Sequence, residues 1–409
     1  MTNEWLKDGF NQTQITLFGL LAYNLFGCEF APDPTTDWSG VIRESFYQGV
    51  HLIAFQRCNE LELSDEARNE IRTLLRKYLM RNLRINQQHT AIHRIMTENG
   101  IPYCILKGAA SAFYYPDPFQ RAMGDVDFFV HERDHERAEQ LLLDNGFLIP
   151  DQVKDYHTVF VKDSCKFEMH KELSGIPKGE MGDRIRACRE TLTEDAILTS
   201  GADAVFMRPS PFHHGLILLL HTQLHLFNEG IGLRHLCDWA VFVNSMTDEA
   251  FRETFEKPLR SLGMWRFACI LGLASHIGLG LPYRSWMGDP EADRELACSI
   301  LLDFLEGGNF GVKDKSRSRV YESRLFSDES KSQVGNALHT VNEWLWEKWP
   351  LTGKCPLLLP FGWVYYFCRR TVLVIKGEKK RIRIRKTVKN SKKRQRIYRK
   401  IRLFHNDTD

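Results

Sequence analysis

The spacing of apolar residues divides the chain into stretches with different expected structures. From residue 1 to about 95 apolar positions recur at helical intervals, and the longest periodic run extends from Asp65 towards Glu98. The apolar positions of that run are Ile71, Leu74, Leu75, Leu79 and Leu83. From about 96 to 210 short apolar runs alternate with turn residues and amphipathic segments, and helical spacing returns from Phe212 to about 310. The pattern predicts a mixed α/β unit between two helical regions.

Four regions follow from these changes. We expect an N-terminal helical region at 1–95, an α/β core at 96–210, a C-terminal helical domain at 211–375 and a basic tail at 376–409. Pro209 and Pro211 mark the boundary between the second and third regions, because proline interrupts regular structure. The polar stretch 311–332 is predicted to be a loop.

Two carboxylates lie one residue apart in the string GDVDFFV at 124–130. Side chains at i and i+2 of a strand project from the same face, so Asp125 and Asp127 can point at one spot and share a hard cation. A plainer interpretation is that both are turn residues leading into a strand, because Gly-Asp pairs are common in turns. The flanking segments favour the first interpretation.

These flanking segments alternate between strand and helix patterns. The apolar run at 101–108 predicts a strand that ends in a Lys-Gly turn and is followed by a helix of small residues. Residues 131–147 have the pattern of an amphipathic helix with an Asn-Gly stop. The string KFEMH at 166–170 predicts a further strand with Glu168 and His170 on one face. A third carboxylate therefore belongs to a strand that follows the aspartate pair.

These motifs resemble the nucleotidyltransferase superfamily of the DNA polymerase beta type and, within it, the mostly bacterial group described as uncharacterised nucleotidyltransferases. The strings that carry the resemblance are ILKG at 105–108, PFQRAMGDVDFFV at 118–130, LLLDNGF at 141–147, FEMH at 167–170, LRHLCDWAVFV at 233–243, GGNFG at 307–311 and LLLPFGW at 357–363. The resemblance implies an α+β fold class, in which a small mixed-sheet nucleotidyltransferase core is flanked by N- and C-terminal helical domains.

The resemblance also implies a set of site residues. Asp125 and Asp127 would bind two divalent ions, Mg²⁺ or Mn²⁺, and Glu168 would be the third metal-binding and catalytic carboxylate. The residues expected to contact the nucleoside triphosphate are Lys107, Gly108, Arg121 and Gly124. Arg121 has a second interpretation as a solvated or salt-bridged loop residue.

Two departures from the superfamily pattern affect this set. The first turn usually carries Gly-Ser, whereas here it is Lys107 and Gly108, so a lysine charge replaces a hydroxyl. Glu168 stands where Asp is commoner and is one methylene longer. Neither change removes a carboxylate.

Composition limits the class of protein. With 43% hydrophobic and 26% charged residues, the chain falls in the soluble globular class. No signal peptide is evident at the N-terminus, and no uncharged apolar run reaches the length of a membrane span. Ten cysteines are scattered without a C-x-x-C pair, which is typical of reduced thiols. We expect a cytoplasmic protein without a structural zinc site.

The C-terminal helical domain contains a group of histidines and a charged pair. His221 and His225 are spaced i,i+4 as in zinc-binding helices, but position 222 is Thr, so the glutamate of zinc proteases is missing. A core or cleft-lining role is predicted for these histidines. Arg234 and Asp238 are also i,i+4, and an intrahelical salt bridge is favoured over contact with a ligand.

Positive charge is concentrated near the C-terminus. The formal charge of the chain is +3, yet 376–404 contains 15 basic residues and one acidic residue. The rest of the chain is therefore mildly acidic. Apolar residues interleave with these charges, which favours binding to RNA or to an anionic membrane surface over a purely solubilising tail.

The predicted function is transfer of NMP from an NTP to an unknown acceptor, with release of pyrophosphate and with Mg²⁺ or Mn²⁺ as cofactor. The alternative is a catalytically inactive protein of the same fold that binds nucleotide or RNA. A kinase-like phosphotransferase is a third hypothesis, weakened because the sequence has no GxxxxGK[ST] string. Nothing in the sequence chooses the acceptor.

Overall fold

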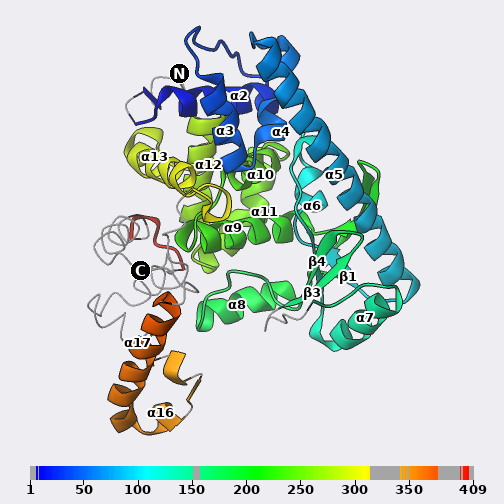
Figure 1. Ribbon diagram of the computed structural model, residues 1–409, viewed down its shortest axis with the longest axis vertical. Helices are drawn as coiled ribbons and strands as arrows, with labels where there is room; N and C mark the ends of the chain where they lie inside the picture. Colours follow the sequence, from blue (N-terminus) through cyan, green and yellow to red (C-terminus); the bar gives the residue numbers. More distant parts are fainter. Residues whose placement is uncertain are drawn as a thin grey trace.

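The computed structural model describes residues 6–7, 9–150, 157–313, 341–342, 344–346, 348–349, 351–375, 397 and 399–404. A small sheet lies beside a large assembly of helices, and one long helix runs along the edge of both (Figure 1). This arrangement confirms the predicted α+β fold class.

The N-terminal part of the chain is helical, as predicted. The helices are α2 Gln12–Phe26, α3 Trp38–Gln48, α4 His51–Ala54, the 3₁₀ turn η1 Cys58–Glu60 and α5 Asp65–Glu98. Helix α2 begins with a capping box in which Asn11 and Gln14 satisfy each other's backbone N–H groups. Helix α5 begins at the N-cap Ser64, whose hydroxyl accepts from the Ala67 amide.

Helix α5 has the predicted extent, but it buries a different stripe from the predicted one. Among the expected apolar positions only Ile71 is buried, while the buried side chains concentrate in the second half of the helix. Asn82, in that half, donates to the backbone oxygens of Phe119 and Arg121 and accepts from the Met123 amide. A buried polar side chain thus fixes the loop that leads to the aspartate pair, which apolar periodicity does not reveal.

The central sheet has four strands in the order β1-β2-β4-β3. Its strands are β1 Tyr103–Ile105, β2 Val126–Val130, β3 His157–Lys162 and β4 Cys165–His170. Strands β2 and β4 are parallel, whereas β1–β2 and β3–β4 are antiparallel, so the sheet is mixed as expected. Between β1 and β3 lie α6 Ala109–Ala112, the 3₁₀ turn η2 Pro118–Gln120 and α7 Glu132–Asp144. Strand β3 is an element that the sequence analysis did not predict.

The two faces of this sheet differ in chemistry because strand side chains alternate. One face carries Ile105, Phe128 and Phe167, which pack in a core with apolar residues of α5 and α7. The opposite face contributes Cys104 and Phe129 to the core of the helical assembly. Charged side chains of β2 and β4 share this second face.

A helix and a hairpin connect the sheet to the later helices. Helix α8 is Glu180–Arg189, and the hairpin consists of β5 Ile197–Gly201 and β6 Ala204–Arg208. Its turn places Ala202 and Asp203 at φ of 50° and 58°, and Asn86 of α5 donates to the Ala202 oxygen. The hairpin was not predicted, and it packs against α5.

The C-terminal helical part is built from α9 Pro211–Phe227, α10 Leu233–Asn244, α11 Asp248–Ser261, α12 Trp265–Leu279, the 3₁₀ turn η3 Ser285–Met287, α13 Pro290–Gly307 and the 3₁₀ turn η4 Asn309–Gly311. Helix α9 starts at Pro211 behind the N-cap Ser210. These helices and α2–α4 bury their apolar residues in one common core. The predicted N-terminal helical region and the predicted C-terminal helical domain therefore share one core.

The last described elements are α16 Leu351–Lys354, the 3₁₀ turn η5 Pro356–Leu358 and α17 Leu359–Ile375, which project from the body of the molecule (Figure 1). Beyond them Ile397, Ile401 and Leu403 are buried in the helical core. The predicted loop at 311–332 lies, after residue 313, outside the described residues. No helix in the described part of the chain combines the length and apolar character needed to cross a membrane.

Candidate active site

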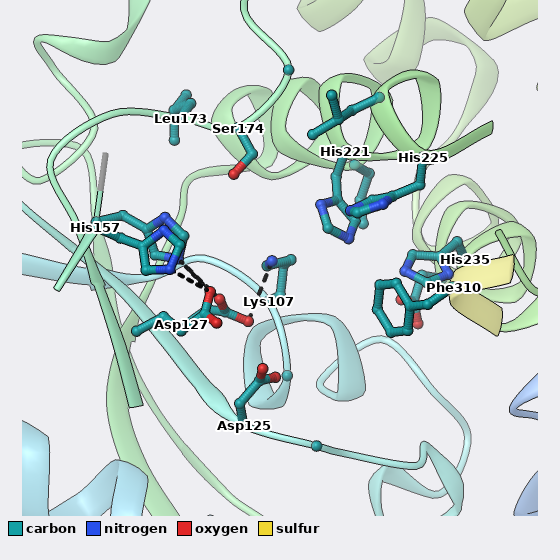
Figure 2. Close-up of a pocket in the computed structure, with 18 of the residues that line it drawn as sticks. Lys107, Asp125, Asp127, His157, Leu173, Ser174, His221, His225, His235 and Phe310 are labelled. Atoms are coloured by element: carbon teal, nitrogen blue, oxygen red, sulfur yellow. Dashed lines mark hydrogen bonds and ion pairs between the residues drawn. The ribbon is translucent and has the colours of Figure 1, made fainter. Parts of the chain in front are cut away.

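A cavity of about 650 Å³ separates the charged face of the sheet from the helices α9 and α10. Its strand wall contains the acidic and basic side chains of β2, β4 and the turn after β1, and its helix wall contains histidines of α9 and α10. Figure 2 shows the aspartates on one side, His221, His225, His235 and Phe310 on the other, and Lys107 between them. We use the names strand wall and helix wall for these two groups below.

The register of the sheet brings the acidic groups of the strand wall together. Asp127 of β2 lies directly opposite Glu168 of β4, and parallel partners point to the same face. His170, two residues further along β4, places its Nε2 at 3.0 Å from Asp127 Oδ1 and 3.5 Å from Glu168 Oε2. Ligand atoms of these three residues all lie within 4.8 Å of one another. Among the described residues they are the group that could hold a metal ion.

Nearby cations compensate these carboxylates. Lys107 Nζ lies 3.3 Å from Asp127 Oδ2, Lys166 forms a close ion pair with Glu168, and His157 Nε2 lies 3.7 Å from Glu168 Oε2. Burial alone would raise the pKa of Asp127, but Lys107 and His170 outweigh it and hold that pKa far below its usual range.

Neighbouring groups also favour the charged forms of the other two members of the group. Burial again opposes ionisation of Glu168, yet the hydrogen bonds from His170 and Lys166 lower its pKa to about 2. Burial lowers the pKa of His170, but its bonds to Asp127 and Glu168 prevail and raise it above the usual value. The strand wall is therefore a network of charges that stabilise one another.

Asp125 lies in the same cavity but outside this network. It precedes the first residue of β2, and no hydrogen bond or ion pair to its side chain is found within the described residues. Burial, together with the negative charge of Asp127, raises the pKa of Asp125 to about 6. The predicted aspartate pair thus reaches one cavity, with one member compensated and the other without a partner.

The Lys-Gly turn and Gly124 line the cavity as well. Gly108 has φ of 61°, a conformation that favours glycine, and a Cβ there would lie 3.4 Å from His89 Nε2. Gly124 is exposed, and its carbonyl accepts from Arg81. The turn brings its backbone close to Asp125, whose carbonyl oxygen would lie 3.7 Å from the same Cβ.

Arg121 also borders the cavity, but its guanidinium is bound by a carboxylate. Its Nε and Nη2 donate to the two oxygens of Asp238 at 2.8 and 2.7 Å, and the side chain is only 4% exposed. Tyr115 donates its hydroxyl to the same carboxylate. The expected intrahelical salt bridge between Arg234 and Asp238 is therefore wrong: in the described structure Asp238 pairs with Arg121, and Arg234 donates to the Ala122 carbonyl. A pair 117 residues apart has replaced the local one.

Aromatic side chains form much of the helix wall. His221, His225 and His235 lie with ring centroids 4.4 to 6.5 Å apart, and the ring of Phe310 packs edge-on against two of them. Burial, with nearby cations, holds the pKa of His221 and of His235 well below the usual value. These histidines line the cavity and do not form a metal-binding group in the described part of the chain, in agreement with the predicted cleft-lining role.

Sequence reasoning missed several cavity residues. Lys166 shares the strand face of Glu168 by the same alternation that placed His170 there, so the signal was present in KFEMH. His157 belongs to the unpredicted strand β3, opposite His170. Phe310, at φ of 53° and ψ of 38°, lies far along the chain in a string that carried no chemical signal.

Comparison with known proteins identifies the family. The model of the family described as "Uncharacterised nucleotidyltransferase" matches residues 34–277, more than half of the chain, so the protein belongs to that family. The match includes both aspartates, Glu168 and the helix wall residues of α9 and α10, and it ends before Phe310 and the basic segment. No curated protein matches the chain.

Proposed function

We propose that the protein is a metal-dependent nucleotidyltransferase of the DNA polymerase beta type. It would transfer NMP from an NTP to an acceptor hydroxyl or phosphate and release pyrophosphate. The observation that carries this proposal is the register between Asp127 and Glu168, which directs carboxylates of two parallel strands into one cavity beside Asp125. Family membership supports transferase chemistry of this kind.

The residues of the strand wall fit a divalent cation. Asp125 offers a carboxylate without a partner, and Asp127 and Glu168 are ionised because neighbouring cations lower their pKa values. Carboxylate oxygens suit Mg²⁺ or Mn²⁺. Such an ion would neutralise phosphate oxygens and lower the pKa of an attacking hydroxyl.

The neighbouring side chains divide the remaining tasks. A carboxylate with a pKa of about 2 is a weak proton acceptor, so we assign Glu168 the role of an anionic ligand. His170 orients Asp127 through its Nε2, and the exposed Gly124 leaves room for substrate beside Asp125. Lys107 and Lys166 keep the carboxylates ionised while no cation is bound.

The test uses NTPs labelled at the α- or the γ-phosphate, incubated with the protein, Mn²⁺ and a cell extract as the source of acceptor. Label from the α-phosphate on any acceptor is the expected result, and Asp125→Ala or Glu168→Ala should abolish it while circular dichroism stays unchanged. Transfer of the γ-phosphate instead would support a kinase. Nucleotide binding without any transfer would support the inactive binding protein.

We further propose that the basic segment 376–404 meets an anionic membrane surface, with RNA as the rival partner. The 3₁₀ turn η5 and helix α17 precede this segment and expose large apolar side chains, with Leu357 of η5 at 83% and Phe361 of α17 at 73%. Apolar side chains next to a basic run match a lipid interface, whereas RNA offers no apolar counterpart to most of them. All ten cysteines are free thiols, which supports a location in the reducing cytoplasm.

Vesicle sedimentation tests this partner. The protein should sediment with vesicles that contain phosphatidylglycerol and not with pure phosphatidylcholine, and salt should weaken binding. Replacing Phe361 by Ser should reduce binding to vesicles and leave any RNA binding intact. Shortening the chain is unsuitable as a test, because it would remove the buried Ile397, Ile401 and Leu403 from the core.

A further inference from the structure

We infer that Arg234, on α10, binds the phosphate chain of the substrate nucleotide from the helix wall, across the cavity from the carboxylates. The inference rests on the proposed function and adds a residue that the resemblance did not supply. It also assigns contact with the phosphates to Arg234 in place of Arg121, which was expected to make it.

Arg234 is a cation for which the described structure provides no carboxylate. Asp238, one helical turn away, is bound by Arg121 and Tyr115. Within the described residues, the guanidinium of Arg234 makes one hydrogen bond, from Nη1 to the Ala122 carbonyl at 2.9 Å. Its Nε is buried and has no partner. Two arginines therefore share the neighbourhood of one carboxylate, and Arg121 occupies it.

The surroundings of Arg234 disfavour its charge. Burial lowers the pKa of Arg234, and the charge of Arg121 lowers it further, against the opposing influence of Asp238 and Asp125. A buried charge without a counterion is costly, and an anion that enters the cavity would remove that cost. Asp125 acts on Arg234 from the strand wall, so a phosphate held between a cation on Asp125 and this guanidinium would meet positive charge on both sides.

The lysines of the cavity are less suited to this role. Lys107 Nζ lies 3.3 Å from Asp127, and Lys166 is paired with Glu168. Each would have to leave a carboxylate to reach a phosphate. A guanidinium can bind two phosphate oxygens at once. The guanidinium of Arg234 borders the cavity and would not have to leave a carboxylate to reach a phosphate.

Phe310 helps to hold Arg234 in place without neutralising it. The guanidinium carbon lies 6.0 Å from the centroid of the Phe310 ring, and the electron-rich face of an aromatic ring attracts a cation. Phe310 is itself fixed against His225 and His235, and its backbone is in the left-handed region that non-glycine residues rarely adopt. An aromatic ring held at such a cost is consistent with a preorganised binding wall.

The experiment measures calorimetric binding of two probes in Mg²⁺, ATP and inorganic tripolyphosphate. Loss of the guanidinium in Arg234→Gln should weaken both probes about 10- to 100-fold, because a charge-assisted bidentate contact to the shared phosphate chain is removed. Arg234→Lys keeps the charge without the fork and should give an intermediate loss. Arg133→Gln, at a side chain 70% exposed on α7, is the control and should bind as the unaltered protein does.

The outcomes separate this inference from the proposed function. If the unaltered protein binds neither probe, the proposed function fails and takes the inference with it. If it binds both probes and the two Arg234 variants bind them as tightly as the unaltered protein does, only the inference fails. A loss for ATP with tripolyphosphate binding retained would also overturn it, since the guanidinium would then recognise the nucleoside. Should Arg234→Gln unfold, Arg234→Lys decides between these results.

Discussion

The two walls of the cavity control charge in opposite ways. On the strand wall each acid of the metal-binding group has a cation beside it, and the pKa values of Asp127 and Glu168 fall below their usual range. On the helix wall burial dominates, so that His221 and His235 are neutral. The difference teaches that charge on the strand wall is held by paired groups, whereas the histidines of the helix wall add no counterion to the guanidinium of Arg234.

The largest effect is expected where the strand wall loses its central acid. Asp127→Asn removes the group that Lys107 and His170 share, and we expect transfer activity to fall about 10³- to 10⁴-fold, because charge stabilisation by a bound metal supplies several kcal/mol. His221→Asn on the helix wall should change kcat by less than about tenfold, because no reacting charge is assigned to it. Steady-state kinetics on both variants checks the contrast, and equal losses would erase it.

A large effect on stability is expected from the ion pair between the walls. Arg121→Met leaves Asp238 buried without its cation, and we expect the free energy of unfolding to fall by about 3 kcal/mol, because Tyr115 still satisfies part of the carboxylate. Denaturant titration measures the loss. The double variant with Asp238→Leu should recover part of it, and if the double variant is less stable than the single one, the pair does not act as a charge pair.

The affinity for Mn²⁺ should depend on pH through Asp125. Because its pKa is about 6, a proton competes with the cation near and below that pH, and apparent affinity should rise about tenfold between pH 5 and pH 7 and then level off. Electron paramagnetic resonance of free Mn²⁺ measures this curve. In Asp125→Asn the rise should be absent, and an unchanged slope would assign the titration to another group.

The smallest effect concerns a histidine behind the helix wall. His214 of α9 is fully buried between Tyr114 and Phe242, and burial lowers its pKa to about 3. Below pH 6.5 His214 binds a proton in the unfolded chain but not in the native state. The free energy of unfolding therefore decreases by about 1.4 kcal/mol for each unit by which the pH is lowered, as the contribution of this group. His214→Phe should reduce that slope by the same amount in denaturant titrations between pH 4.5 and 6. Parallel slopes would mean that His214 is protonated in the folded protein.

Local patterns predicted much of the fold. The extent of α5, the strands β2 and β4, and the shared face of Glu168 and His170 all follow from periods of 3.6 and 2 within one segment. Strand β3 was not predicted, although its string HTVFVK is rich in β-branched residues, because its buried positions are consecutive and give no period-2 signal.

The parts of the site that could not be predicted depend on long-range pairing. Which arginine takes Asp238 is decided by how α10 packs against the loop before β2, and the local i,i+4 spacing pointed to the wrong partner. The missing partner of Arg234 follows from the same packing. Likewise Asp125 and Asp127 look alike in sequence, yet one gains Lys107 and His170 while the other gains none.

The alignment of β2 with β4 sets a limit on how this protein can change. A slip of one residue between them would send Glu168 and His170 into the apolar layer beside Phe128 and would turn Phe167 towards the substrate space. Insertions or deletions within either strand should therefore abolish folding and chemistry together. Such a sequence can vary by replacement at single positions far more readily than it can vary in strand length.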